Sequence, residues 1–156
     1  MNENYAELIP GFPLFKGFTR DGANRLLKSG EVKEHAAGEV LLKEGDAADR
    51  VLLLLTGGLE VFVERNGKDL VLTETKPGTV VGELAVLCGI PRSASVRAQE
   101  NSAVLEWSDE AFRTLLLRDP HLSQRIFGQI LRTLVEKESA LIDSLITAQH
   151  LGQRSR

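Results

Sequence analysis

The stretch from Val81 to Ala98, which reads VGELAVLCGIPRSASVRA, carries the strongest functional signal in the chain. Gly82 lets the backbone approach a bulky group closely, because glycine has no side chain. The residues that follow predict a short helix, and the free N–H groups of a first helical turn suit an anion. Glu83, at the start of that helix, offers a carboxylate that can accept hydrogen bonds from a pair of hydroxyls.

A basic residue follows this predicted helix after a proline break. Arg92 comes directly after Pro91, and its planar guanidinium suits a phosphate. Ser93 beside it fits either a phosphate contact or a small strand residue. A carboxylate for a sugar, with a guanidinium and main-chain N–H groups for a phosphate, predicts a nucleotide-binding site.

Two motifs give this prediction a family. GELA at 82–85 with RSASVRA at 92–98 resembles the phosphate-binding cassette of the cyclic-nucleotide-binding domain family, which includes the bacterial catabolite activator protein and protein kinase regulatory subunits. LLKEGDAA at 41–48 resembles a second signature of that family. It departs at Leu42, where the pattern usually has Val, Ile or Cys, a change that concerns packing. The resemblance extends from about Phe12 to Leu145, and two ordered motifs make it specific.

The resemblance implies a stand-alone regulatory domain without enzymatic activity and without a cofactor, whose ligand is cAMP in preference to cGMP. It implies that Arg92 and the N–H groups of the turn at 82–85 hold the cyclic phosphate, and that Glu83 binds the ribose 2′-hydroxyl. The implied ligand-binding residues are Gly82, Glu83, Leu84, Ala85, Arg92, Ser93 and Ala94.

Base recognition does not transfer in the same way. The catabolite activator protein also contacts the base from its long helix, and the corresponding positions here are Lys137 and Glu138, with Thr133 nearby. Neither of the first two is the hydroxyl residue found in that relative. These three residues are the candidates for base contacts.

Composition bounds the remaining function classes. A length of 156 residues fits one domain, 1–156, with its own core. A net charge of −3 gives no general affinity for nucleic acid or for an anionic membrane. The longest uninterrupted apolar run, Val51–Leu55, is too short to span a bilayer, and no secretory leader is visible.

The single cysteine, Cys88, cannot form an internal disulfide, which fits a reducing cytosol. We expect it to be a small buried residue of the cassette helix. The residues after the long C-terminal helix are too few for a helix-turn-helix. We therefore expect a cytoplasmic protein that binds neither DNA nor membrane.

Residues 1–30 predict an N-terminal helical segment, with Thr19 or Asp21 as the cap of a short helix. Residues 31–107 predict short strands joined by Gly-rich turns, which is typical of a jelly roll. The strands are expected at 31–36, 39–43, 51–55, 59–64, 70–75, 93–99 and 103–107.

Local patterns add detail to these strands. The first two read as a meander. Val51–Leu55 has no polar alternation and predicts a strand buried on both faces. Phe62 alternates with Val61 and Val63, on the same side as two glutamates, and Asn66-Gly67 is a strong hairpin signal. Arg97 lies at an odd offset from Arg92, so we expect it on the surface, away from the site.

Residues 108–149 predict two C-terminal helices. Ser108 is a good N-cap for the first, and Trp107 and Phe112 stand where a hydrophobic staple would form. Asp119-Pro120 predicts the start of the second helix. The expected fold class is therefore α+β: a double-stranded β-helix (jelly roll) barrel flanked by N-terminal helices and two C-terminal helices.

The second of these helices has a wide apolar stripe. Phe127, Leu134 and Leu141 repeat by seven, which suggests that another helix packs on it. We expect a homodimer through residues 126–146, with Glu138 interrupting the seam, or the binding of an unidentified effector protein.

Three other functions fit parts of the same sequence. One is a degenerate scaffold domain without a ligand, although such a domain would be expected to lose Glu83 or Arg92. Another is a receptor for a different nucleotide such as cyclic di-GMP. The third is a metal-dependent jelly-roll enzyme, but His35, His121 and His150 are scattered and lack metal-ligand spacing, so we expect no metal.

Overall fold

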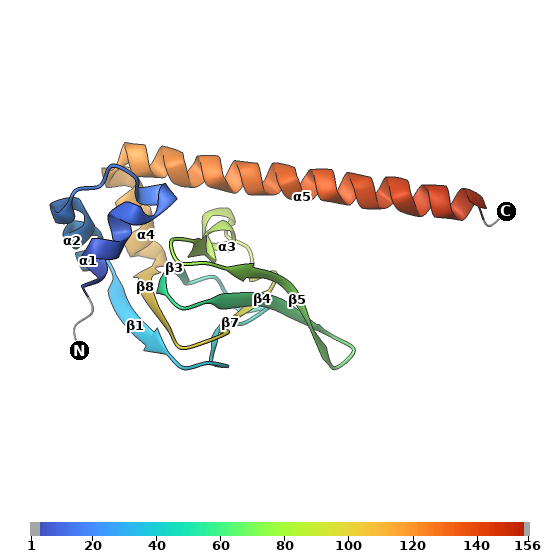
Figure 1. The fold of residues 1–156 in the computed structure, drawn as a ribbon, viewed down its shortest axis with the longest axis horizontal. Helices are drawn as coiled ribbons and strands as arrows, with labels where there is room; N and C mark the ends of the chain where they lie inside the picture. The colour runs from blue at the N-terminus through green and yellow to red at the C-terminus, as the bar shows by residue number, and fades with distance from the viewer. Residues whose placement is uncertain (1–3, 155–156) are drawn as a thin grey trace. The chain divides into compact units, whose positions relative to one another are not determined.

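Two four-stranded antiparallel sheets make up the β part of the protein in the computed structural model, which describes residues 4–154 (Figure 1). The first sheet has the order β1 (Glu31–His35), β8 (Ser102–Ser108), β3 (Arg50–Thr56) and β6 (Val80–Val81). The second has the order β2 (Val40–Leu42), β7 (Ser95–Ala98), β4 (Leu59–Arg65) and β5 (Lys68–Thr75).

Helices precede, interrupt and follow the strands along the chain. Before them come α1 (Tyr5–Leu8), the 3-10 turns η1 (Ile9–Gly11) and η2 (Pro13–Phe15), and α2 (Arg20–Lys28). Between β6 and β7 lies α3 (Glu83–Cys88), and after β8 come α4 (Asp109–Arg118) and α5 (Pro120–Arg154). The predicted fold class, a jelly roll with helices at both ends of the chain, is confirmed.

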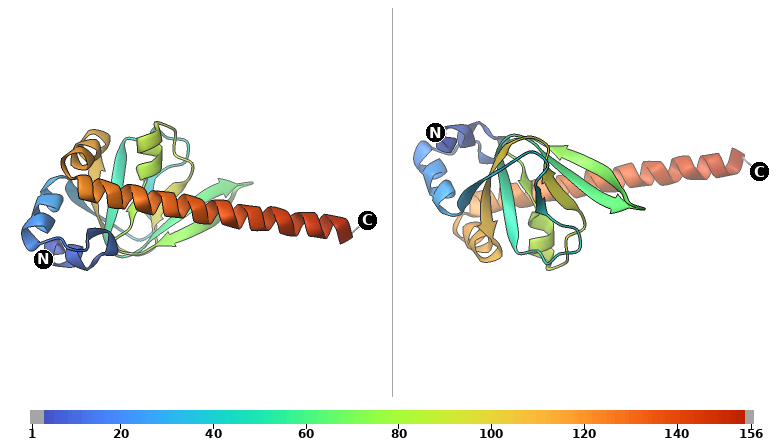
Figure 2. Two further views of the ribbon diagram at one scale, coloured as in Figure 1. Left: turned by 90° about the horizontal axis from the view of Figure 1, so that it is seen from above. Right: turned by 90° about the horizontal axis from the view of Figure 1, so that it is seen from below.

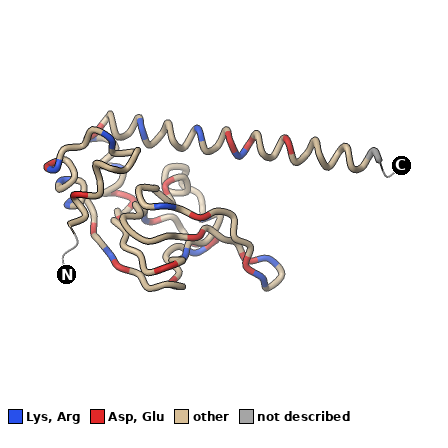
Figure 3. The backbone as a smooth tube through the Cα atoms, viewed as in Figure 1, with Lys and Arg blue, Asp and Glu red and all other residues tan. Residues whose placement is uncertain are grey.

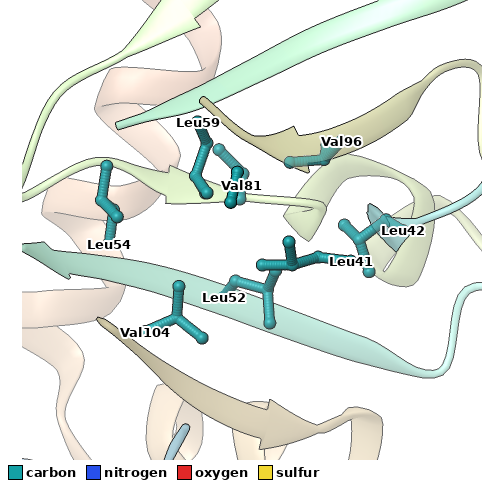
Figure 4. Packing of buried hydrophobic residues seen from close by; sticks show 9 residues of the cluster. Leu41, Leu42, Leu52, Leu54, Leu59, Val81, Val96 and Val104 are labelled. Atoms are coloured by element: carbon teal, nitrogen blue, oxygen red, sulfur yellow. The ribbon is translucent and has the colours of Figure 1, made fainter. Parts of the chain in front are cut away.

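Aliphatic side chains from both sheets fill the space between them (Figure 4). Leu52 and Leu54 of β3 face Leu59 of β4 and Val96 of β7 in this cluster. All of Val51–Leu55 is at most 1% exposed, which confirms the prediction of a strand buried on both faces. Since burying one such side chain stabilises a fold by about 1.5–3 kcal/mol, β3 is a central element of the core.

Several local predictions are also confirmed. Thr19 Oγ1 accepts a hydrogen bond from Gly22 N at 3.0 Å and caps α2, and Ser108 Oγ accepts one from Ala111 N at 3.0 Å and caps α4. The rings of Trp107 and Phe112 lie 5.7 Å apart, as the staple requires.

The β4–β5 hairpin turns at Asn66 and Gly67, both with positive φ (56° and 74°), as a two-residue primed turn requires. Figure 2 shows this hairpin extending beyond the neighbouring strands.

The predicted meander at the start of the β region is wrong. β1 and β2 belong to different sheets, β1 pairing with β8 and β2 with β7. The chain between them bonds to β7 instead of folding back on β1: Gly38 N donates to Ala98 O at 2.7 Å, and Ala98 N donates to Glu39 O at 2.8 Å. The turn residues at 37–38 therefore predict a local hairpin, whereas the chain crosses there from one sheet to the other.

Strict alternation along β4 also fails. A register shift lies between Val61 and Phe62, and Phe62 is only 7% exposed, although strict alternation predicts it on the side of the glutamates. The guanidinium of Arg97 lies 4.2 Å from the centre of the Phe62 ring and covers it.

Two more predictions require correction. The strand expected at 93–99 is β7, and it begins only at Ser95. Arg92 therefore lies before the strand, and alternation along a strand cannot decide whether Arg92 and Arg97 face opposite sides. Arg97 is instead kept from Arg92 by its own partners, Glu60 at 2.9 Å and Asp69 at 2.6 Å. Cys88 is exposed at the end of α3 instead of buried.

The chain divides after Asp119 into a unit that contains the sheets and a second unit that contains α5. α5 is one uninterrupted helix of 35 residues and extends past the predicted end at 149 (Figure 1). Among the described residues, no helix combines the length and the apolar character needed to cross a bilayer.

Candidate functional site

Gly82 links β6 to α3 and has a backbone conformation that few other residues adopt. Its φ of 83° lies in the left-handed region, and the helix begins at the next residue. Gly89, with a φ of 66°, ends the same helix. α3 is therefore a helix of six residues with a glycine on each side.

Arg92 is buried beside Gly82, with only 5% of its surface exposed. Its Nη1 donates to the carbonyl of Gly82 at 2.7 Å, and its Nη2 donates to the carbonyl of Arg50 at 2.5 Å. Its own backbone is held as well, because Arg92 N donates to Asp46 O at 3.0 Å and Gly45 N donates to Arg92 O at 2.9 Å. The two family motifs of the sequence, 41–48 and 82–98, thus meet at this arginine.

The space around Arg92 depends on the missing side chain of Gly82. A Cβ at Gly82 would stand 2.6 Å from Arg92 Nη1 and 3.0 Å from Leu42 Cδ1. Leu42, the departure from the family pattern, therefore packs on the site without replacing a polar group.

The two carbonyls that accept hydrogen bonds from Arg92 carry no formal negative charge, so they do not neutralise its guanidinium. Burial lowers the pKa of Arg92, while the negative charges of Asp49 and Glu83 act in the opposite direction and the positive charge of Arg50 adds to the lowering. A buried cation in this setting gains from an anion brought close to it.

The other predicted ligand-binding residues, at 83–85 and 93–94, differ in how far their side chains are exposed. Glu83, Ala85 and Ala94 are half-buried, and Leu84 and Ser93 are exposed. The structure brings Gly82 and Arg92 into direct contact. Ser93 points to no partner that the described contacts identify, and its role stays a prediction.

Sequence reasoning missed three groups that position Arg92. The carbonyl of Arg50 and the loop at Gly45 and Asp46 bond to it directly. Ser95, which is 7% exposed, accepts a hydrogen bond from Glu44 N at 2.8 Å and so fixes the residue directly before Gly45. Main-chain carbonyls leave no pattern in the sequence, although the second family motif, at 41–48, includes Gly45 and Asp46 of this loop.

Thr133, Lys137 and Glu138 are exposed residues of α5, in the second unit of the chain. Their proposed contact with a base stays a prediction. Among residues 4–154, no cluster of three or more His, Cys, Asp or Glu side chains has a metal-binding arrangement. A hollow of about 670 Å³ lies between α2 and α4, lined by residues such as Arg25 and Thr114, and the cassette does not contribute to it.

Comparison with known proteins identifies the family. The pattern of the cyclic nucleotide-binding domain matches residues 32–119, more than half of the chain, including Gly82, Arg92 and the loop that holds Arg92 but not the candidate base contacts on α5. The chain belongs to this family. The resemblance that the two motifs indicated is thereby confirmed.

Individual relatives agree with this assignment. The chain is 32% identical over 133 residues to a cAMP-dependent protein kinase regulatory subunit of Blastocladiella emersonii, covering 85% of this chain and 32% of that protein. The chain thus spans only about a third of this relative's length.

Two solved structures have the same architecture. The catabolite activator protein of Thermus thermophilus is 25% identical with a TM-score of 0.74, over 83% of this chain and 61% of that one. A cyclic nucleotide-binding domain from Methylobacillus flagellatus KT is 26% identical with a TM-score of 0.67, over 86% and 76%.

Proposed function

We propose that this cyclic nucleotide-binding domain is a cAMP sensor in the cytoplasm, and that Arg92 is the residue on which ligand binding depends. The supporting observation is the burial of its guanidinium between the carbonyls of Gly82 and Arg50. A guanidinium has five N–H donors, so donors remain for a ligand oxygen after these two bonds. The single negative charge of a cyclic phosphate would compensate the buried positive charge.

The remaining contacts follow from the same cassette. The N–H groups of Glu83, Leu84 and Ala85, in the first turn of α3, would bind the second phosphate oxygen. Glu83 is placed next to Gly82 and would accept a hydrogen bond from the ribose 2′-hydroxyl. Ser93 and Ala94 would border the phosphate on the side of the chain that leads into β7.

The output of the sensor would be α5. Thr133, Lys137 and Glu138 on this helix would contact the base, so that a ligand changes the population of α5 conformers. The same helix exposes large apolar residues, and a second copy of the chain or an effector protein would cover them.

Isothermal titration with cAMP, cGMP and cyclic di-GMP tests the proposal directly. We expect one molecule of cAMP per chain and weaker binding of the other two. If only cyclic di-GMP binds, or if none of the three binds, the proposal is wrong. A protein without bound nucleotide, verified by its absorbance ratio, is needed at the start.

A further inference from the structure

A closed ring of polar contacts joins Arg92 to the first turn of α4. On one side, Arg92 donates to Gly82 O, and Gly82 leads into α3, whose Val86 carbonyl accepts a hydrogen bond from Arg113 Nη2 at 2.6 Å. On the other side, Arg92 donates to Arg50 O, next to Asp49. The two sides meet again on α4.

The meeting point is the ion pair between Asp109 and Arg113. Asp109 N, at the first residue of α4, donates to Asp49 O at 2.9 Å. The side chain of Asp109 accepts a hydrogen bond from Arg113 Nε at 2.5 Å. α4 therefore contacts both carbonyl-bearing segments that hold Arg92: the Asp49–Arg50 segment through its backbone, and α3 through Arg113. Both α3 and α4 pack on β3 (Figure 1).

Arg113 is suited to this bridge because two different nitrogens of one rigid plane make the two bonds. Its acceptor on α3, the carbonyl of Val86, belongs to the last turn of that helix, where main-chain carbonyls lack full intrahelical partners. Gly89 N also reaches the same carbonyl, at the longer distance of 3.3 Å. A movement of α3 toward a ligand would therefore pull on Arg113.

We propose that Arg113, held by Asp109, is a positioning residue that couples occupancy of the phosphate site to the start of α4. The coupling rests on the proposed function of the cassette. A ligand at Arg92 and α3 shifts both sides of the ring together, so α4 responds to it through Arg113 and through the Asp49 carbonyl.

The only tryptophan of the chain reports on this end of α4. Trp107 directly precedes the cap Ser108, its ring lies 5.7 Å from that of Phe112 of α4, and its Nε1 donates to Ser29 Oγ at 2.8 Å. A change at the first turn of α4 therefore alters the surroundings of the indole. Its fluorescence is a readout that is separate from ligand affinity.

The experiment compares Arg113→Ala with Arg118→Ala, which removes an arginine from the end of the same helix. Titration calorimetry measures cAMP binding, and Trp107 emission measures the response of α4. We expect the parent and Arg118→Ala to bind cAMP with a change in emission. We expect Arg113→Ala to bind cAMP with most of that change lost. A full response in Arg113→Ala, or no response in a parent that binds cAMP, overturns the coupling.

Arg113→Lys tests whether the bridge or the charge matters. Lysine keeps the charge, but its single ammonium cannot occupy both positions of the guanidinium, so we expect the response to stay low. Full rescue by lysine contradicts the bridge. Asp109→Asn is a second variant should Arg113→Ala fail to fold, and we expect it to lower the response as well.

A ligand-free measurement separates this coupling from the proposed function. In Arg113→Ala, hydrogen exchange at the amides of Gly89, Ile90 and Arg92 should accelerate by about 10- to 150-fold, the factor expected when one charged hydrogen bond is lost from a local opening equilibrium. Unchanged exchange at all three amides contradicts the ring. If no nucleotide binds the parent, the proposed function and the coupling to occupancy both fail, and the exchange result still decides whether Arg113 holds α3.

Discussion

The carbonyl of Gly82 lies 2.7 Å from Nη1 of Arg92, and the same nitrogen lies 2.6 Å from the point where a Cβ of residue 82 would stand. The glycine is thus required twice: for its left-handed backbone and for the space that the guanidinium fills. The two requirements can be separated experimentally, because Gly89 at the other end of α3 has the first without the second. Nothing lies within 4 Å of a Cβ built at Gly89.

Gly82→Ala should therefore weaken cAMP binding by about tenfold or more, equivalent to about 1.4 kcal/mol, because Arg92 must move. Gly89→Ala is the matched control. Each variant places alanine at positive φ, which costs about 1–2 kcal/mol of stability. Urea unfolding should show this loss in both, whereas calorimetry should show the loss of affinity in Gly82→Ala alone. Equal affinities of the two variants would contradict the steric role of Gly82.

Arg92→Ala should abolish measurable cAMP binding and leave the fold intact. Leaving a desolvated phosphate without its partner costs about 3–5 kcal/mol, which is about two to three and a half decades in affinity. Arg97→Ala is the control, since Arg97 pairs with Glu60 and Asp69 and covers Phe62. That variant should keep its affinity and lose stability of the order of 1 kcal/mol. Parent-like cAMP binding by Arg92→Ala would refute the site.

Glu83→Ala should remove discrimination between cAMP and 2′-deoxy-cAMP. A hydrogen bond to a charged group contributes about 1.5–3 kcal/mol, so the parent should prefer cAMP by about 10- to 150-fold. The variant should bind cAMP and its 2′-deoxy analogue about equally, because the hydroxyl has lost its acceptor. The ratio of the two dissociation constants is the measurement. A ratio that the substitution leaves unchanged would mean that Glu83 does not contact the ribose.

The parts of the site that depend on side chains could be predicted from the sequence. Gly82 and Arg92 were identified from their chemistry and their spacing, and the structure places them in contact. Capping by Ser108 and the turn at Asn66 and Gly67 were predictable for the same reason, because each depends on a side chain or a backbone preference at one position.

The groups that fix Arg92 could not be predicted in this way. The Arg50 carbonyl would be available from any residue at position 50, and its location depends on how β3 meets the cassette. The crossover between β1 and β2 likewise depends on bonds from Gly38 and Glu39 to Ala98, about sixty positions away in the chain. Cys88 lies two residues, or about 200° of helix, from the buried Val86, so a helix with one buried face leaves it exposed.

The long helix gives the last prediction, that the chain forms a homodimer through residues 126–146. Phe127, Leu134 and Leu141 are 44%, 41% and 60% exposed, and they repeat by seven. Figure 3 shows charged residues of both signs along the middle of this helix; within 126–146 they are Arg132, Glu136, Lys137, Glu138 and Asp143, and none of them belongs to the repeat of three apolar residues. An exposed apolar stripe of this length favours a partner helix, and a second copy of the chain supplies the same heptad pattern.

Sedimentation velocity with Leu134→Glu tests the dimer. At tens of micromolar, a concentration at which a micromolar dimer is mostly assembled, the parent should sediment as a dimer. The variant should sediment as a monomer, because two glutamates would face each other in a seam that Glu138 already interrupts. Leu117→Glu is the control, since Leu117 of α4 is 84% exposed and lies outside the stripe, and it should stay dimeric. A parent that is monomeric with and without cAMP, and unchanged by Leu134→Glu, would mean that the stripe serves a different partner.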